Sequence, residues 1–379
     1  MKIALLTRSL NYGGAERQLV ALAKGLHEQG HEVVVAVFYG GGPLQKELTD
    51  GGVAVHSLEK HGRWDVLGFG LRLIKLIKLQ TPDVLHSYLG IPNILTAIIK
   101  PLFPSTRMAW GVRASNIPAG RSDWTARVAY RIECRLARFA DLIIANSHAG
   151  LEYAALNGFP KPRMIVIPNG IDVKRFRIDE AARHRLRDEW RITDDQILAG
   201  LVGRLDPMKD HPTFLNAAAA LVKQRDDLRF VCVGDGGEEY RKHLRALSQE
   251  MGLSQHLIWA DARSDMRAVY NALDVIVSAS SYGEGFSNVV AEAMACGVAP
   301  VVTDVGDSAW VVGSVGDVIP PGDHAALALA LTRIADRIAR GDRRREDCRR
   351  RIVERFSVGA LETTTAAALR QLCNPSGIL

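Results

Sequence analysis

Two glutamates eight residues apart are the side chains in this sequence most suited to chemistry. Glu284 lies between Gly283 and Gly285, whereas Glu292 falls inside an unbroken run of helix-forming residues. Glycine on both sides favours a loop over a helix interior, so Glu284 is expected in a loop. A pair of carboxylates at this spacing suggests either acid/base work on a sugar or the binding of sugar hydroxyls.

A helix is expected directly after the first of these glutamates. Ser287 or Asn288 can cap a helix that runs through Ala293 and ends near Gly297. One carboxylate then precedes the helix N-terminus and the other lies about one turn inside it. Free N–H groups and the positive end of the helix dipole favour an anion there, and carboxylates bind hydroxyls. A phosphorylated sugar meets both requirements.

Two other interpretations of the glutamate pair are possible. In a continuous helix, eight residues would separate the carboxylates by roughly 12 Å, which exceeds the ~5.5 to 9.5 Å of glycosidase acid pairs. A loop at the start shortens that separation, so hydrolysis is disfavoured but stays open. Two solvated glutamates on a surface helix are the other alternative, and the apolar Val289, Val290 and Met294 argue against it.

A second loop carries two cations. Gly203 directly follows an apolar run, Arg204 comes next, and Lys209 follows after a proline. The guanidinium fork and the compact ammonium can together hold a diphosphate and stabilise its developing negative charge without a metal. An exposed salt bridge to Asp206 or Asp210 is the alternative.

Other polar residues follow apolar runs in the first half of the chain. Gly13 and Gly14 open the first helix, and they allow a phosphate close to the backbone, although a simple strand–helix turn is about as compatible. His86 ends one run and can donate to a sugar hydroxyl, but a structural histidine fits nearly as well. Arg17, Arg113 and Asn146 are further candidates on the acceptor side.

Short apolar runs alternate with helical stretches along the whole chain, which predicts parallel sheets wrapped by helices. The predicted strands are 3–6, 33–38, 53–57, 84–87, 108–112, 142–145, 164–167, 198–202, 229–233, 257–259, 275–278, 299–303 and 316–319. Each half resembles a doubly wound unit, and residues 169–179 form the expected junction. The fold class is therefore α/β, with two Rossmann-like domains and ligands in a crevice at the carboxyl ends of the strands.

Composition narrows the class of protein. The chain has 379 residues, 24% of them charged and 47% hydrophobic, with a formal net charge of +6, which is ordinary for a globular protein of two domains. The sequence shows no zinc spacing and no nucleic-acid-binding signature. Five scattered cysteines without a CxxC pair favour a reduced compartment. Without a signal peptide or an apolar run of ~18 residues, a cytoplasmic protein is expected.

Two basic segments could make peripheral contact with a membrane. The helix at 71–79 can rest on an anionic membrane, but a packed helix with Arg72, Lys75 and Lys78 as its solvated stripe is favoured. The arginine clusters at 343–345 and 349–351 are interpreted mainly as a solvated helix.

Taken together, the ordered motifs resemble the retaining GT-B glycosyltransferases of glycosyltransferase family 4. They are GGAER (13–17), VGRLDPMKD (202–210), VGDG (233–236), SYGEGFSNVVAEAMACG (281–297) and VVTDVG (301–306). The resemblance covers nearly the whole chain. It implies an N-terminal acceptor-binding domain at 1–170 and a nucleotide-sugar-binding domain at 171–359. A C-terminal helix at about 360–379 is expected to pack back onto the first domain.

The resemblance also implies roles for particular residues. Glu284 touches donor-sugar hydroxyls, Glu292 holds the ribose, and Arg204 with Lys209 binds the diphosphate. His86 occupies the family's histidine position and joins Arg204, Lys209 and Glu284 as a catalytic residue. The remaining donor-binding residues that it implies are Gly13, Gly14, Gly203, Arg263, Gly285, Phe286, Ser287, Asn288 and Val289.

Two departures from the family pattern bear on substrate choice. The loop after the strand at 257–259 reads Ala260-Asp261-Ala262-Arg263 where the family usually has a glycine, and in the family this loop lies against the nucleotide base. Asn288 stands where many relatives carry a small or apolar residue, and this difference bears on the choice of donor sugar.

The implied activity is that of a metal-independent hexosyltransferase with no cofactor. It would move a sugar from a nucleotide sugar, expected to be a UDP-sugar, to an acceptor hydroxyl with retained configuration. A glycan or lipid-linked glycan of a bacterial cell surface is the expected acceptor, handled in the cytoplasm or at the inner face of the membrane. The alternatives are a nucleotide-sugar epimerase of the same architecture and a non-catalytic sugar-nucleotide-binding protein.

Overall fold

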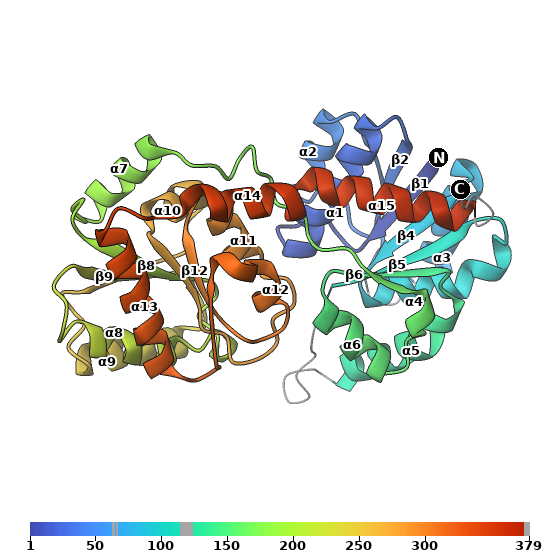
Figure 1. Ribbon diagram of the computed structural model, residues 1–379. Helices are drawn as coiled ribbons and strands as arrows, with labels where there is room; N and C mark the ends of the chain where they lie inside the picture. The colour runs from blue at the N-terminus through green and yellow to red at the C-terminus, as the bar shows by residue number, and fades with distance from the viewer. Residues whose placement is uncertain (63–64, 66, 114–123, 375–379) are drawn as a thin grey trace. The chain divides into compact units, whose positions relative to one another are not determined.

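The computed structural model describes residues 1–62, 65, 67–113 and 124–374. The chain divides into two compact units (Figure 1). The first unit comprises Met1–Gly170 and the C-terminal segment that begins at Val358, and the second comprises Ile171–Ser357. Each unit has its own parallel sheet and its own hydrophobic core.

The sheet of the first unit has seven strands in the order β3-β2-β1-β4-β5-β6-β7, all parallel. Its strands are β1 Lys2–Thr7, β2 Glu32–Val37, β3 Ala54–Ser57, β4 Val84–Tyr88, β5 Arg107–Val112, β6 Leu142–Ala145 and β7 Met164–Val166. Helices cover both faces of a parallel sheet, and for that reason its central strands are apolar on both sides. β4, in the centre, is buried along its whole length.

Helices on the two faces of this sheet follow from its strand order. They are α1 Gly14–Glu28, α2 Gln45–Asp50, α3 Leu67–Gln80, α4 Gly90–Ile99, α5 Trp124–Leu136, α6 His148–Leu156 and α15 Val358–Cys373, with 3₁₀ turns η1 Lys100–Leu102, η2 Ala137–Phe139 and η3 Lys161–Arg163. Right-handed crossovers place α1 and α2 on one face and α3 to α6 on the other. α15 runs along α1 (Figure 1) and packs into the core on that face.

The sheet of the second unit has six parallel strands in the order β10-β9-β8-β11-β12-β13. Its strands are β8 Ile197–Val202, β9 Leu228–Val233, β10 Leu257–Ala260, β11 Val275–Ser278, β12 Ala299–Thr303 and β13 Asp317–Ile319. Its helices are α7 Glu180–Glu189, α8 His211–Leu221, α9 Glu238–Glu250, α10 Met266–Ala272, α11 Asn288–Ala295, α12 Ser308–Val312, α13 His324–Ala339 and α14 Arg345–Phe356, with η4 Pro207–Lys209 and η5 Gly313–Val315.

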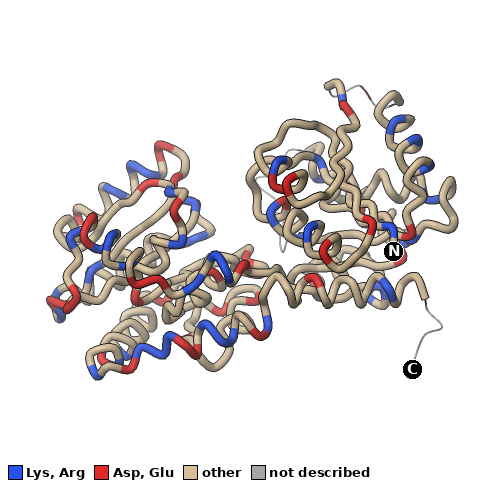
Figure 2. Tube along the Cα trace, turned by 90° about the horizontal axis from the view of Figure 1, so that it is seen from above, with Lys and Arg blue, Asp and Glu red and all other residues tan. Residues whose placement is uncertain are grey.

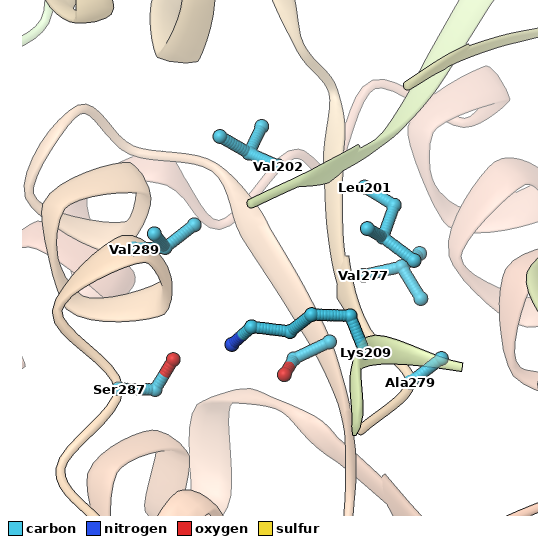
Figure 3. A pocket seen from close by; sticks show the side chains of 8 residues that line it. Leu201, Val202, Lys209, Val277, Ala279, Ser287 and Val289 are labelled. Atoms are coloured by element: carbon cyan, nitrogen blue, oxygen red, sulfur yellow. The ribbon is translucent and has the colours of Figure 1, made fainter. Parts of the chain in front are cut away.

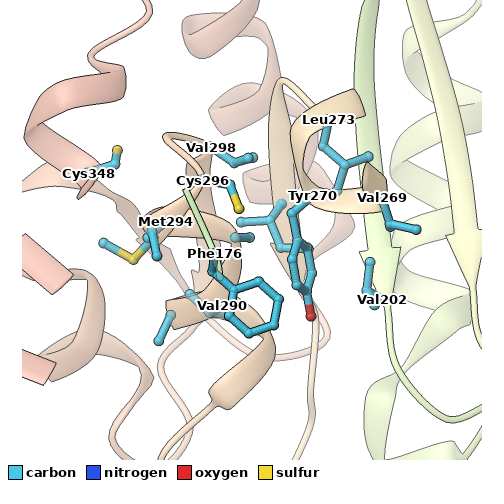
Figure 4. Packing of buried hydrophobic residues seen from close by; sticks show 14 of the residues in the cluster. Phe176, Val202, Val269, Tyr270, Leu273, Val290, Met294, Cys296, Val298 and Cys348 are labelled. Atoms are coloured by element: carbon cyan, nitrogen blue, oxygen red, sulfur yellow. The ribbon is translucent and has the colours of Figure 1, made fainter. Parts of the chain in front are cut away.

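One core cluster of the second unit anchors α11 (Figure 4). Val290 and Met294 of α11 are fully buried in it. Phe176 and Tyr270 pack edge to face beside them, with ring centroids 5.7 Å apart. Packing of this kind fixes the rotation of α11, and with it the position of Glu292.

The predicted fold class is confirmed, and all thirteen predicted strands are present, each within one residue at either end. The last helix, expected from about residue 360, begins at Val358. The part of that expectation that concerns 375–379 lies outside the described residues. α3 is the favoured packed helix, because Leu73 and Ile77 are buried and Lys75 and Lys78 are exposed. The prediction of a solvated side chain is wrong for Arg72, because its guanidinium donates to the Leu58 carbonyl at 2.7 Å.

The interpretation of the arginine clusters as a solvated helix is wrong for three of their members. Arg343 forms an ion pair with the buried Asp274. Arg349 donates to the Ala295 carbonyl at 2.7 Å and the Val173 carbonyl at 3.0 Å, and Arg351 donates to the carbonyls of Trp310 and Val311. Arginine has five donors in a rigid fork, so it can saturate helix-terminal carbonyls that no backbone N–H reaches.

Candidate active site

An ion pair joins Lys209 and Glu284 in the second unit. Lys209 ends η4, in the loop between β8 and α8, and Glu284 lies in the loop between β11 and α11. Asp206 caps η4 by accepting from the Met208 N–H, and Asp210 caps α8 by accepting from Thr213. These caps fix the backbone on both sides of Lys209, so the ammonium has a defined direction.

The loop that carries Glu284 is held from two sides. The Ser280 hydroxyl donates at 2.7 Å to Glu284 Oε1, the same oxygen that Lys209 contacts, and the Thr303 hydroxyl donates to the Ser280 carbonyl at 2.6 Å. Gly306 lies in the left-handed region at φ +60°, and a Cβ there would come within 2.0 Å of the Glu284 carbonyl oxygen. Only glycine allows the β12–α12 loop to approach so closely. Glu284 is consequently buried and fixed at 8% exposure.

A similar backbone contact holds the loop of Arg204. A Cβ on Gly234 would lie 1.9 Å from the Gly203 carbonyl oxygen, so the loop after β9 packs directly on the loop after β8. A parallel bridge between Leu205 and Gly236 continues this contact. The Arg204 side chain itself is exposed and forms no ion pair within the part of the chain that the structure describes. It is therefore a cation available to an anionic ligand.

The N-terminus of α11 lies beside the Lys209 ammonium. Ser287 is the N-cap residue, and its side chain makes no capping hydrogen bond. Ser287, Val289 and Lys209 line a small pocket at the ends of β8 and β11, with the ammonium pointing toward the Ser287 hydroxyl (Figure 3). Its volume of about 10 Å³ holds about one water molecule.

Glu292 is held by a residue that the sequence did not single out. The Tyr270 hydroxyl, from α10, donates to the Glu292 carboxylate at 2.7 Å. The Tyr270 ring is buried in the core, whereas its hydroxyl lies at the edge of the packed cluster (Figure 4). Nothing in the sequence spacing indicates this pair, because the two residues are 22 positions apart on different helices.

Two other predicted donor residues have different surroundings from those expected. Phe286 is buried in the core, with its ring 5.3 Å from that of Phe356, so only its backbone can contact a ligand. Arg263 pairs with Asp265 and Glu189 and lies 5.9 Å from the Trp190 ring. Hydrogen bonds to Asp265, and then to Glu189, raise the pKa of Arg263. Its guanidinium is thus already engaged by carboxylates.

In the first unit, His86 and Arg113 belong to one cluster. The His86 imidazole is fully buried, and neither ring nitrogen has a hydrogen-bond partner among the described residues. Burial, and secondarily Arg113, lowers the pKa of His86 to about 3. Arg113 lies 4.9 Å above the Tyr88 ring and donates to the Asn169 side chain at 2.8 Å. A neutral imidazole next to a fixed cation can hydrogen-bond an uncharged hydroxyl.

The other predicted residues of the first unit share the same edge of its sheet. Gly13, Gly14 and Arg17 follow β1, and Asn146 follows β6. Strands β1, β4, β5 and β6 are adjacent and parallel, so the residues after them meet at one edge. Gly13 is the N-cap of α1, Arg17 is exposed, and Asn146 is buried beside Ser147, which caps α6.

Charged side chains are distributed over both units, with basic and acidic residues interleaved along the trace (Figure 2). No helix in the described part of the chain has both the length and the apolar character needed to cross a bilayer.

Comparison with known proteins assigns the family. Residues 12–175 match the model described as Glycosyltransferase Family 4, and residues 196–337 match Glycosyl transferases group 1. A GDP-mannose-dependent alpha-mannosyltransferase of Mycobacterium tuberculosis is 27% identical over 81% of this chain and 80% of its own length. A D-inositol 3-phosphate glycosyltransferase of Catenulispora acidiphila is 26% identical over 86% of this chain and 83% of its own.

Solved structures share the fold. The Anabaena protein HepE in complex with UDP superposes with a TM-score of 0.84 at 23% identity, covering 98% of this chain and 100% of that one. Sucrose-phosphate synthase from Thermosynechococcus elongatus gives a TM-score of 0.78 at 20% identity, with 99% and 100% coverage. Together with the two family matches, this places the chain among the GT-B glycosyltransferases of glycosyltransferase family 4.

Proposed function

We propose that the chain transfers a sugar from a nucleoside diphosphate sugar to an acceptor hydroxyl with retention of the anomeric configuration. The observation that carries this proposal is the Lys209–Glu284 ion pair beside the N-terminus of α11. It combines a cation and a helix N-terminus, both suited to a diphosphate, with a carboxylate for sugar hydroxyls in one place.

In this proposal the protein acts chiefly on the leaving group. The bond from the anomeric carbon to the diphosphate oxygen breaks as the bond to the acceptor oxygen forms, and the acceptor proton passes to the departing phosphate. Arg204 and Lys209 stabilise the negative charge that develops on that phosphate. Glu284 binds the sugar and Glu292 the ribose. His86, neutral at pH 7, donates to a substrate hydroxyl. The two cations take the place of a metal ion.

For the donor, we propose a UDP-sugar. The UDP complex of the Anabaena structure supports it through the shared fold, whereas a GDP-sugar is favoured by the name of the mycobacterial relative. For the acceptor, we propose a glycan or lipid-linked glycan of a bacterial cell surface, which would bring the protein to the inner face of the membrane.

Thermal shifts against UDP-, GDP- and ADP-sugars test the donor. We expect one nucleotide to raise the melting temperature at concentrations at which the other two do not, and Lys209→Ala to lose most of that shift. The exposed Lys223, in the same unit, provides the matched control Lys223→Ala. If no sugar nucleotide stabilised the protein, the donor site would be misassigned.

Product analysis then separates the three functions that the sequence left open. A transferase forms a glycoside whose anomeric proton has the donor's configuration in NMR. An epimerase would release a new sugar from the donor alone, and a binding protein would show the thermal shift without turnover across an acceptor panel. An inverted product would overturn the proposal of retention.

A further inference from the structure

Exposed apolar side chains of the first unit concentrate on one side of its sheet. Helices α3 to α5 and the turns after them carry Leu67, Leu71, Leu79, Ile91, Ile98, Leu102, Trp124, Val128, Ile132 and Phe139, each exposed. Within the described residues, α1, α2 and α15 on the other side carry none. Isolated exposed apolar residues need no explanation, but a one-sided set of this size indicates a contact surface.

α5 combines this apolar character with positive charge. Trp124, Val128 and Ile132 recur every four residues, and they are 67%, 41% and 41% exposed. Arg127, Arg131 and Arg135 are exposed between them, and η2 continues the same pattern. We call this surface the α5 face; it consists of Trp124, Arg127, Val128, Arg131, Ile132, Arg135, Arg138 and Phe139.

Within the described residues, no ion pair balances the charge of the α5 face. Glu133 is the single acidic residue of α5, and it is buried, where its carboxylate accepts from the Asn93 side chain at 2.8 Å. None of the four arginines forms an ion pair within the described part of the chain. α3 differs, because its Arg72 is bound to Asp65 and to backbone carbonyls.

We propose that the α5 face binds an anionic lipid surface. Large apolar side chains can enter the boundary between headgroups and acyl chains, while guanidinium groups pair with lipid phosphates at the same level. A nucleic acid would match the arginines but not the aliphatic Val128 and Ile132, which cannot stack on bases. A protein partner would be expected to bring acidic side chains, and for that reason it is an outcome that the test below must separate.

This inference deepens the proposed function, because a lipid-linked acceptor would bring the enzyme to a membrane. It can be tested without donor, acceptor or turnover, so its failure would leave the transferase assignment untouched. The measurement is co-sedimentation of the full chain with vesicles of phosphatidylglycerol and phosphatidylcholine, compared with vesicles of phosphatidylcholine alone.

Two double variants separate the charge from the apolar contribution. Each basic residue near an anionic surface contributes about five-fold to membrane partitioning. We therefore expect the double variant Arg131→Glu with Arg135→Glu to bind at least ~25-fold more weakly. In Val128→Ser with Ile132→Ser, we expect a clear loss of binding with unchanged charge. All four side chains are exposed, so folding, checked by circular dichroism, should be retained.

The matched control reverses the charge of two exposed lysines outside the α5 face, with Lys46→Glu in α2 and Lys223→Glu after α8. It has the same net charge as the arginine variant and should bind vesicles like the unmodified chain. Binding that fell equally in the control would mean that net charge alone is responsible, and it would overturn the proposal. So would the absence of binding to anionic vesicles, which would leave the α5 face to a protein partner.

Discussion

Lys209 and Glu284, which are 75 residues apart, form an ion pair that ties together the loops after strands β8 and β11. The two strands are neighbours in the sheet, so the pair lies directly at its carboxyl edge. An ammonium has three donors, and one carboxylate does not saturate it. Glu284 can therefore hold the lysine in place while the remaining N–H groups face a phosphate.

Replacing Lys209 by alanine tests the catalytic role of this cation. We expect Lys209→Ala to lower kcat at least ~100-fold, which is the scale for losing one charge-stabilising contact. Steady-state kinetics with the best donor from the thermal-shift screen measures it. Lys223→Ala, which removes an exposed lysine just after the far end of α8, serves as the control. Unchanged turnover in Lys209→Ala would remove this residue from the mechanism.

Tyr270→Phe tests whether Glu292 is held for the nucleotide. The variant removes only the hydroxyl that donates to Glu292, while the ring keeps its place in the core. A hydrogen bond to a charged group contributes ~1.5 to 3 kcal/mol, so we expect the nucleotide to bind about ten-fold more weakly. Calorimetry should show the same loss for the free nucleoside diphosphate as for the sugar nucleotide, because the ribose is common to both. A loss confined to the sugar nucleotide would contradict the ribose assignment.

The fold was predictable because buried parallel strands are short apolar runs that end at polar or glycine residues. β8 and β11 illustrate this, since each is followed at once by a loop that carries a residue of the pair, Lys209 or Glu284. Gly234 and Gly306 belong to the VGDG and VVTDVG motifs, but the reason for them is a backbone contact with another loop. A contact of that kind depends on the folded sheet and leaves no local pattern.

The limits of sequence reasoning are clearest at Tyr270 and Arg349. A tyrosine among apolar residues predicts a core position, which is correct, but it does not predict that the hydroxyl reaches Glu292. An arginine in a basic run predicts a solvated face, yet Arg349 binds carbonyls from segments 54 and 176 residues away. Both contacts join elements distant in sequence, and a hydrophobic period contains no information about them.

Chelation tests the proposal that two cations replace a metal. We expect donor turnover in excess EDTA to equal that in buffer, because Arg204 and Lys209 supply the positive charge at the diphosphate. Titration of Mg²⁺ and Mn²⁺ back into the assay should give no stimulation. Activity that disappeared with EDTA and returned with either ion would show that these cations are insufficient.

The buried His86 predicts a particular dependence of stability on pH. Burial, with a smaller contribution from Arg113, lowers the pKa of His86 to about 3, whereas the histidine of the unfolded chain has its ordinary pKa of 6.5. Between these values His86 binds more protons in the unfolded state, so its contribution to stability should fall as the pH decreases from about 6.5 toward 3 and stay constant above that range. His211, whose pKa is lowered to about 4 chiefly by burial and then by Lys209, acts in the same direction.

Urea unfolding of His86→Leu at several pH values measures this effect. We expect the variant to lose less stability than the unmodified chain between pH 7 and pH 4, because one protonation site of the unfolded state is gone. The difference in stability between pH 7 and pH 8 should be unaffected, which serves as the internal control. Parallel curves over the acidic range would show that His86 takes up its proton at the same pH in the folded and unfolded states.

Asp274→Asn tests the buried charge cluster of the second unit. The Asp274 carboxylate accepts from Arg183 at 2.8 Å, from Arg187 at 3.0 Å and from the Leu198 N–H at 2.9 Å, and it also pairs with Arg343. Burial opposes ionisation, but Arg183 and Arg187 outweigh it and lower the pKa of Asp274.

Asparagine would leave three arginines at this site without a counter-charge, two of them buried. Breaking a buried pair costs ~3 to 5 kcal/mol, so we expect the free energy of unfolding of the second unit, measured by urea denaturation, to fall by about that amount. Asp317→Asn, which removes the partner of the exposed Arg333, should cost no more than ~1 kcal/mol. Arg183 also binds the carbonyls at the end of α10, the helix that carries Tyr270. Asp274→Asn should therefore weaken nucleotide binding as well, whereas a purely local effect would leave that affinity unchanged.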